Sequence, residues 1–249
     1  MKKSLFILII TLFVTSNVYA GIVVRPARSQ ISIEKENAFN GKYTIINDND
    51  AAITVAITTE DWNNSPNNKD VQLSDWLEVK KKSVVLAPHE EAEIEYTVKS
   101  GNFEGSLSGM VSFTYRSPKA SNINLMTSVP VYMTVKGTEK IEYSIESLSI
   151  VGSKDVNKPP YVQYVAKNDG NVPLRLIGNI KVMKGKKVVF EKRIREQSPV
   201  YAGNIRSFME DINAIGKGKY ILTISLDAYE KSVEKSCQFR VNKYGDISF

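Results

Sequence analysis

Histidine and cysteine, the side chains that most often carry nucleophilic or metal chemistry, occur once each in this chain of 249 residues. His89 follows a proline in the segment LAPHEEAE, and Cys237 lies in the alternating segment SCQFRV. A Ser-His-Asp or Cys-His arrangement would have to use His89, and two residues are too few for a zinc site of the usual kind. We therefore expect no catalytic residue, metal site or cofactor, with His89 in an exposed turn and Cys237 a small buried side chain.

Two stretches with the pattern Tyr-x-x-x-Asn-Asp are the next candidates for chemistry. YTIINDND covers residues 43–50, and YVAKNDGN covers residues 164–171. Clustered Asp and Asn oxygens can bind calcium, but the first stretch lacks the glycine and the distant glutamate of an EF-hand loop. Asn and Asp side chains also stabilise turns by bonding their own backbone. We expect a strand followed by a tight turn in both places, so the repeat indicates a duplicated fold.

The elements that would position any site are strands, because apolar residues recur at every second position. EAEIEYTVKS alternates apolar with charged residues, and the longest run, INLMTSVPVYMTV, spans residues 123–135 with its odd-numbered residues on one face. Turn residues separate these runs, and no amphipathic stripe with helix caps appears. The pattern predicts an all-β fold of two immunoglobulin-like β-sandwich domains, with a barrel as the alternative.

The N-terminal residues 1–20 have the three parts of a secretory signal peptide: Lys2 and Lys3, an apolar run, and the small-residue ending VYA. That run is too short to span a bilayer, and no later run is long enough, so no membrane span is expected. The domains are predicted at residues 21–137 and 138–249, with a short join. We expect a periplasmic location, with the cell surface as the alternative.

The charge of the chain is mildly positive and evenly spread. Without Lys2 and Lys3, 31 basic and 27 acidic side chains remain. Interspersed charges of this kind predict no nucleic-acid binding. Trp62 and Trp76 flank an Asn-rich loop and could bind a carbohydrate, but burial in the first sandwich is the expected role.

Three segments resemble, in order and spacing, the N-terminal domain of PapD-like periplasmic chaperones of pilus assembly. They are YTIINDND, the proline-containing turn before EAEIEYTV, and GMVSFTYRSP, which leads through a loop into the long strand at residues 123–135. The likeness covers roughly residues 23–135, and a second sandwich follows, as in that family. It implies a non-enzymatic chaperone whose partners are a pilin-like or other β-rich secreted subunit and an outer-membrane usher.

The resemblance also implies where a subunit binds. In the family the long strand pairs with an incomplete subunit and lends it alternate apolar side chains. Matching the strands places the donor positions at Ile123, Leu125 and Thr127. Core packing in the first domain is the alternative role for the odd-numbered residues of this strand, above all for Val129, Val131 and Met133.

A basic pair in the interdomain cleft holds the subunit's terminal carboxylate in the family. Arg28 matches one member, better than Arg25 does, but the other falls on Pro130, with Lys136 as a substitute. The family's Glu-Ser signature is replaced by SLSGM, and the second domain has no cysteine pair, so the resemblance is to a divergent member. Because Pro130 lacks a backbone donor, strand pairing must be interrupted there or Pro130 must lie on the free side.

Two other functions stay open from the sequence. The chain could be a structural component of a pilus, coat or envelope scaffold that has no chaperone activity. Alternatively, it could be an enzyme or a carbohydrate-binding protein, which substitution of Trp62 or Trp76 would test.

Overall fold

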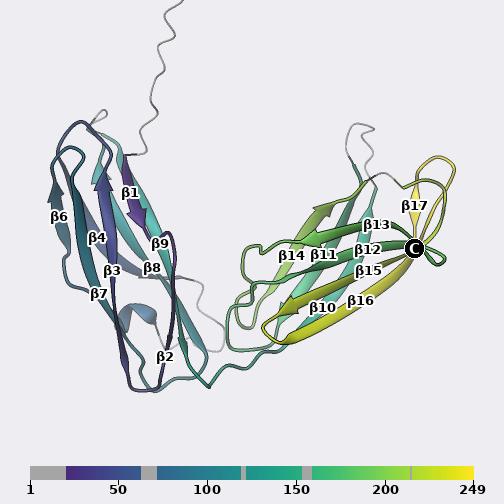
Figure 1. The fold of residues 1–249 in the computed structure, drawn as a ribbon, viewed down its shortest axis with the longest axis horizontal. Helices are drawn as coiled ribbons and strands as arrows, with labels where there is room; N and C mark the ends of the chain where they lie inside the picture. The colour runs from purple at the N-terminus through teal and green to yellow at the C-terminus, as the bar shows by residue number, and fades with distance from the viewer. Residues whose placement is uncertain (1–20, 63–71, 119–121, 153–158, 214) are drawn as a thin grey trace, which may run out of the picture.

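The computed structural model describes residues 21–62, 72–118, 122–152, 159–213 and 215–249. The predicted signal peptide, residues 1–20, lies outside the described residues. Two β-sandwiches at an angle make up the fold (Figure 1), which confirms the predicted all-β class with two immunoglobulin-like sandwiches. In the described ranges the one helical element is the 3-10 turn η2, Leu73–Asp75.

Strands β1 to β9 form the first sandwich. One sheet has the order β1-β3-β7-β5, and the other has the order β2-β9-β8-β4-β6. All neighbours are antiparallel except β2 and β9, which run parallel. The strands are β1 (Ile22–Arg25), β2 (Ser29–Ile33), β3 (Ala38–Asn47), β4 (Ile53–Asp61), β5 (Leu77–Val79), β6 (Ser83–Leu86), β7 (Glu91–Lys99), β8 (Ser106–Arg116) and β9 (Asn124–Val135).

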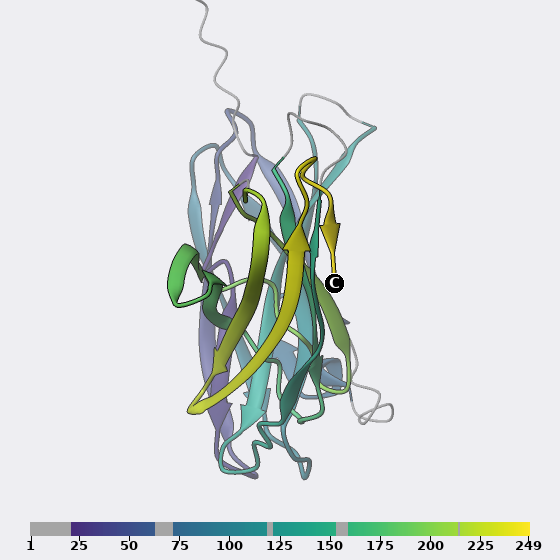
Figure 2. The same cartoon turned by 90° about the vertical axis from the view of Figure 1, so that its right-hand side faces the viewer.

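Strands β10 to β17 form the second sandwich. Its sheets have the orders β10-β11-β14 and β13-β12-β15-β16-β17, and Figure 2 shows this sandwich in front of the first. The strands are β10 (Tyr143–Val151), β11 (Tyr161–Asn168), β12 (Ile177–Lys184), β13 (Lys187–Ile194), β14 (Ile205–Asp211), β15 (Gly218–Ala228), β16 (Lys231–Val241) and β17 (Ile247–Ser248).

Each sandwich has its own core, because the alternating apolar residues of both sheets point inward. Tyr43 and Tyr164, the tyrosines of the two repeats, are among the largest fully buried side chains, and burial raises the pKa of both phenols. Val129, Val131 and Met133 are buried in the first core, which confirms that prediction. Full burial of such apolar side chains contributes about 1.5–3 kcal/mol each.

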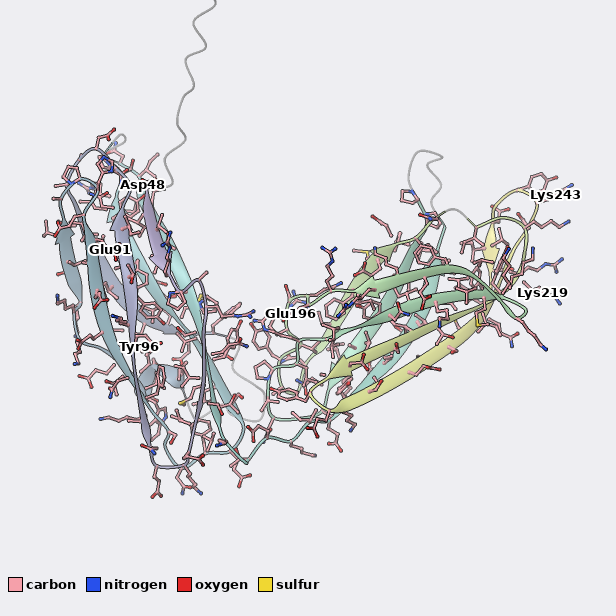
Figure 3. All side chains as sticks on the ribbon, in the orientation of Figure 1. Asp48, Glu91, Tyr96, Glu196, Lys219 and Lys243 are labelled. Carbon is pink, nitrogen blue, oxygen red and sulfur yellow. The ribbon has the colours of Figure 1, made fainter. Side chains whose placement is uncertain are left out.

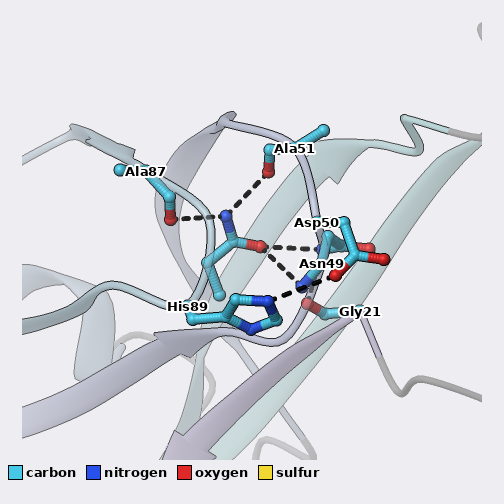
Figure 4. Close-up of polar contacts among 7 residues, drawn as sticks. Gly21, Asn49, Asp50, Ala51, Ala87 and His89 are labelled. Atoms are coloured by element: carbon cyan, nitrogen blue, oxygen red, sulfur yellow. Dashed lines mark hydrogen bonds and ion pairs between the residues drawn. The ribbon is translucent and has the colours of Figure 1, made fainter.

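The repeated asparagines end equivalent strands and bind the turn that follows. In the first sandwich, Asn47 Nδ2 donates to the carbonyls of Ala51 at 2.9 Å and Ala87 at 2.8 Å, and Asn47 Oδ1 accepts from the Asn49 amide at 3.1 Å (Figure 4). Asn168 ends β11 with the same set of bonds in the second sandwich. The expected turns are confirmed, and each asparagine also reaches a segment distant in sequence.

Hydrogen bonds to both sandwiches hold the join between them. Thr138 Oγ1 accepts from the Gly105 amide at 2.8 Å and donates to the Val135 carbonyl at 2.7 Å. From the second sandwich, Asn171 Nδ2 donates to the Thr138 carbonyl at 2.9 Å. β9 ends at Val135 and β10 begins at Tyr143. The domain boundary between residues 137 and 138 stays a prediction.

His89 and Cys237 lie apart, one in each sandwich. His89 is exposed in a turn, with a φ of 60° and its Nε2 atom 3.2 Å from Asp50 Oδ1, as expected for a turn residue. Cys237 is half-buried rather than fully buried, because β16 places its side chain at the margin of the second core. Burial raises the pKa of its thiol, which lowers the thiolate fraction at neutral pH.

Candidate partner-binding site

Strand β9 has one fully paired edge and one partly paired edge. Along its whole length it pairs with β8, from Asn124 opposite Arg116 to Thr134 opposite Ser106. On its other side, β2 pairs only with residues 131–135, while β1 pairs with β3 in the opposite sheet. Among the described residues, no strand pairs with this other side of β9 over residues 124–130. We call the unpaired side of this stretch the outer edge of β9.

Backbone hydrogen bonds determine which residues face the outer edge. The Ser117 amide donates to the Ile123 carbonyl at 2.9 Å, and the Val135 amide donates to the Gly105 carbonyl at 2.9 Å. In an antiparallel pair, the backbone N–H and C=O groups of every second residue point toward the same neighbouring strand. The N–H and C=O groups of the odd-numbered residues of β9 therefore point toward β8. The even-numbered residues, Pro130 among them, face the other side. Pro130 therefore lies on the free side and does not interrupt the β8–β9 pairing, which answers the question that the sequence left open.

Ile123 and Leu125 continue the apolar row of the core past the point where the core ends. Ile123 is 52% exposed and Leu125 is 41% exposed, and Leu125 lies opposite Tyr115 on the inward face of the sheet. Thr127 is half-buried opposite Phe113. The first two residues can therefore contact a partner, while Thr127 lies at the boundary with the core. Their role in binding stays a prediction.

Arg28 lies where the first sandwich meets the second. Its Nη1 atom is 3.1 Å from Glu196 Oε1, and the Nη1 atom of Arg175 is 3.4 Å from the same oxygen. The Arg175 guanidinium also lies over the ring of Tyr132, 5.3 Å from its centroid. Figure 3 shows Glu196 at the end of the second sandwich nearest the first. Two arginines from different sandwiches thus share one carboxylate.

Lys136, the predicted substitute for the second basic residue, does not lie beside Arg28. β2 runs parallel to β9, so Lys136 lies at the opposite end of β2, about 20 Å away at about 3.3 Å per residue. Its Nζ atom is 2.9 Å from Glu34 Oε1, and this hydrogen bond raises the pKa of Lys136. The structure thus corrects the expected pairing: the basic neighbour of Arg28 is Arg175. No sequence motif marks Arg175, which follows the second Asn-Asp turn.

Three aromatic rings also connect the sandwiches. The Tyr132 and Tyr201 hydroxyls are 3.2 Å apart, and Trp62 meets Tyr201 edge to face with centroids 5.5 Å apart. Trp62 therefore packs between the sandwiches, and its predicted burial within the first sandwich is wrong. The cause is that its amide bonds to β8 at the outer end of β4, where the second sandwich is in reach. Trp76 packs partly buried against the first core.

Glu196→Gln is expected to change the free energy of unfolding by less than about 1 kcal/mol, because the side chains of Arg28 and Glu196 are 39% and 48% exposed and water screens the pair. Urea unfolding followed by circular dichroism measures this change. Trp62→Ala, which removes a packed ring, is the contrasting variant and should cost more. A loss of 2 kcal/mol or more for Glu196→Gln, on the order of a buried pair, would contradict this account.

No protein-family model and no curated protein matches the chain. Among solved structures, the class 5 fimbriae chaperone CfaA matches with 15% identity and a TM-score of 0.48, covering 86% of this chain and 98% of its own. The YadV chaperone matches with 10% identity and a TM-score of 0.48, covering 88% and 99%. A structure of the Salmonella enterica SafA pilin in complex with the SafB chaperone matches with 8% identity and a TM-score of 0.46, covering 87% and 96%.

The matched structures are of chaperones, which is the class of protein that the sequence resembles. Identities this low concern the fold alone, so the function is argued from the geometry of β9 and its surroundings. Within the described ranges, none of the helical segments has the length and apolar character needed to cross a bilayer.

Proposed function

We propose that this protein is an exported chaperone-like binding protein that holds a β-rich secreted subunit by strand addition at the outer edge of β9. The observation that carries the proposal is the absence, in the described part of the chain, of a strand paired with residues 124–130, next to the exposed Ile123 and Leu125. Unpaired strand edges are normally protected, so an uncovered edge with apolar flanks favours a binding role. The signal-peptide pattern supports export to the periplasm.

The main chain and the side chains of β9 would make different contributions. The even-numbered residues Asn124, Met126 and Ser128 present their backbone groups to an added strand, and each hydrogen bond contributes about 0.5–1.5 kcal/mol. Ile123 and Leu125 would enter the subunit's open core, at about 1.5–3 kcal/mol each when fully buried. Main-chain pairing would thus supply affinity for many subunits, and the two side chains would supply the fit.

Arg28 and Arg175 would be the polar end of this site. Their shared bond to Glu196 supports the view that the pair can hold a carboxylate, because arginine forks match carboxylate oxygens. We place a subunit carboxylate there, in exchange for Glu196. Lys136 is too far along β2 to join this pair. An outer-membrane usher as a further partner rests on the sequence resemblance.

The test is capture of the partner by the mature protein from the native envelope extract. The Ile123→Asp, Leu125→Asp double variant is expected to bind the captured subunit at least about a hundredfold more weakly, because it loses two apolar contacts. The matched control is Val85→Asp, which changes a 67% exposed apolar residue on β6, the opposite edge of the same sheet. Circular dichroism checks that each variant is folded, and mass spectrometry identifies the captured protein.

The outcomes separate the proposed chaperone from a structural component. A β-rich secreted subunit that is bound by wild type and by Val85→Asp, but not by the double variant, supports the proposal. Equal capture of the same polymeric material by all three proteins would instead indicate a structural component and contradict strand addition at β9.

A further inference from the structure

Strand β14 is an edge strand of the second sandwich. On one side it pairs with β11, from Ile205 opposite Lys167 to Asp211 opposite Tyr161. Among the described residues, no strand pairs with the other side, which we call the free edge of β14. Most residues of the strand are exposed. A row of unpaired backbone groups is a template for pairing with another chain, so this edge is a candidate interaction surface.

Backbone pairing with β11 determines which groups of β14 point to the free edge. The Ile212 amide, just past the end of the strand, donates to the Pro160 carbonyl at 3.0 Å. In an antiparallel pair every second residue bonds to the same neighbour, so the even-numbered residues of β14 bond to β11 and the odd-numbered residues point to the free edge. One outward carbonyl is already occupied, because Lys192 Nζ donates to that of Asp211 at 3.1 Å. The open part of this edge is therefore residues 205–209.

The exposed side chains of β14 are complementary to themselves about Ser207. Ile205 is 62% exposed and Met209 is 66% exposed, and both lie on the outer face of the sheet with Ser207 between them. When two copies of β14 pair antiparallel about a two-fold axis at Ser207, Ile205 of each copy lies opposite Met209 of the other. Arg206 then lies opposite Phe208 of the other copy. This register thus pairs apolar with apolar side chains and brings no like charges together.

The neighbouring registers fit less well. With the axis at Arg206, the Arg206 side chains of the two copies would lie opposite each other, and like charges in that position are destabilising. With the axis at Phe208 or Met209, an outward-pointing residue would pair with Asp211. The carbonyl of Asp211 is the one that Lys192 already holds. The free backbone groups and the side chains therefore favour the same register.

We propose that the free edge of β14 binds a second copy of this chain, by antiparallel pairing about a two-fold axis at Ser207. The contact is isologous, because each copy presents the same strand. It joins the two sheets of order β10-β11-β14 into one sheet and covers Ile205 and Met209 of both copies. The interface lies in the second sandwich, so the proposal does not rest on strand addition at β9.

Disulfide crosslinking tests the register. The background is Cys237→Ser, which removes the one native cysteine. In it, Ser207→Cys places two thiols opposite each other with Cα atoms about 5.5 Å apart, a distance that a disulfide can span. The matched control is Ser83→Cys, at an exposed serine of β6, another edge strand. We expect mild oxidation of the purified mature protein to yield at least about tenfold more covalent dimer for Ser207→Cys than for the control.

Sedimentation velocity tests the association itself. We expect wild type to form dimers at sub-millimolar concentration, because the contact of one strand pair is small. Met209→Lys places a charge against Ile205 of the other copy and should raise the dissociation constant of the dimer at least about tenfold. Val85→Lys, which changes a 67% exposed apolar residue of β6, should leave that constant unchanged. Circular dichroism checks that each variant is folded.

Three results would overturn the interface. They are a wild type that stays monomeric at sub-millimolar concentration, equal yields of covalent dimer from Ser207→Cys and Ser83→Cys, and a dimer that Met209→Lys does not weaken. In the last case the interface would lie elsewhere, for example at the outer edge of β9. No subunit is present in these measurements, so their failure would leave the proposed function intact.

Discussion

Asn168→Asp is expected to lower the free energy of unfolding by about 3–5 kcal/mol at neutral pH. The side chain is fully buried; its Nδ2 atom donates to the Val172 and Val200 carbonyls, both at 2.8 Å, and its Oδ1 atom accepts from the Gly170 amide at 2.9 Å. In the variant, a carboxylate oxygen replaces the Nδ2 donor. When the carboxylate is ionised, this oxygen has no proton to donate and is repelled by the two carbonyl oxygens that it faces. Urea unfolding at pH 7.5 followed by circular dichroism measures the loss.

The loss should shrink as the pH falls. Burial and the two facing carbonyls favour the neutral acid, so the introduced carboxyl has a higher pKa in the folded state than in the unfolded chain. A raised carboxyl pKa means that the folded state binds more protons, so the variant's relative stability is greatest below the unfolded pKa and is lost as the pH rises through the folded pKa. The difference in unfolding free energy between variant and wild type, measured from pH 7.5 down to pH 4, tests this sign.

Asn102→Asp is the matched control, because Asn102 is exposed and makes no side-chain hydrogen bond to any described residue. It should change stability by no more than about 0.5 kcal/mol. Asn47→Asp should behave like Asn168→Asp, since the two asparagines have equivalent bonds. A difference between wild type and Asn168→Asp that does not depend on pH would contradict the assignment of a buried carboxyl.

The asparagine repeat illustrates what local sequence can predict. A strand that ends in Asn-Asp predicts a turn, because the asparagine bonds an amide two residues later. The bonds from Asn47 to Ala87 and from Asn168 to Val200 join segments that are distant in sequence. No local pattern marks those carbonyls, so their contribution to the fold is visible only in three dimensions.

The candidate site, too, can be predicted from the local sequence only in part. Alternation along residues 123–135 predicts the strand, its core residues and the apolar Ile123 and Leu125, because a strand has a period of two. Whether an edge is free depends on where β2 begins to pair with β9, which is a tertiary fact. Arg175 and Trp62 meet their partners across the two sandwiches. Each is a single residue outside any repeat, so the sequence alone could not predict that they lie between the two sandwiches.

Thr127→Pro and Met126→Pro are adjacent substitutions with opposite expected effects on stability. The backbone of Thr127 faces β8 opposite Phe113, so proline there removes a donor from the β8–β9 pairing and leaves a buried carbonyl of β8 unpaired. We expect Thr127→Pro to lower the free energy of unfolding by about 3 kcal/mol or more. The backbone groups of Met126 face the outer edge, as those of Pro130 do. Met126→Pro should therefore lower the free energy of unfolding by less than about 1 kcal/mol. Urea unfolding of both variants measures the difference.

Met126→Pro also separates binding from folding. If a subunit pairs with the outer edge of β9, the proline removes one donor to that strand and leaves the subunit's carbonyl unpaired, so affinity should fall about tenfold or more in a folded protein. The Val85→Asp variant, which is also altered at an exposed apolar residue of this sheet, should keep its affinity. Unfolding of Met126→Pro to the same extent as Thr127→Pro would mean that residues 124–130 are already paired. Full affinity in a folded Met126→Pro protein would place the subunit's main chain elsewhere, because an added strand cannot pass this position without using its donor.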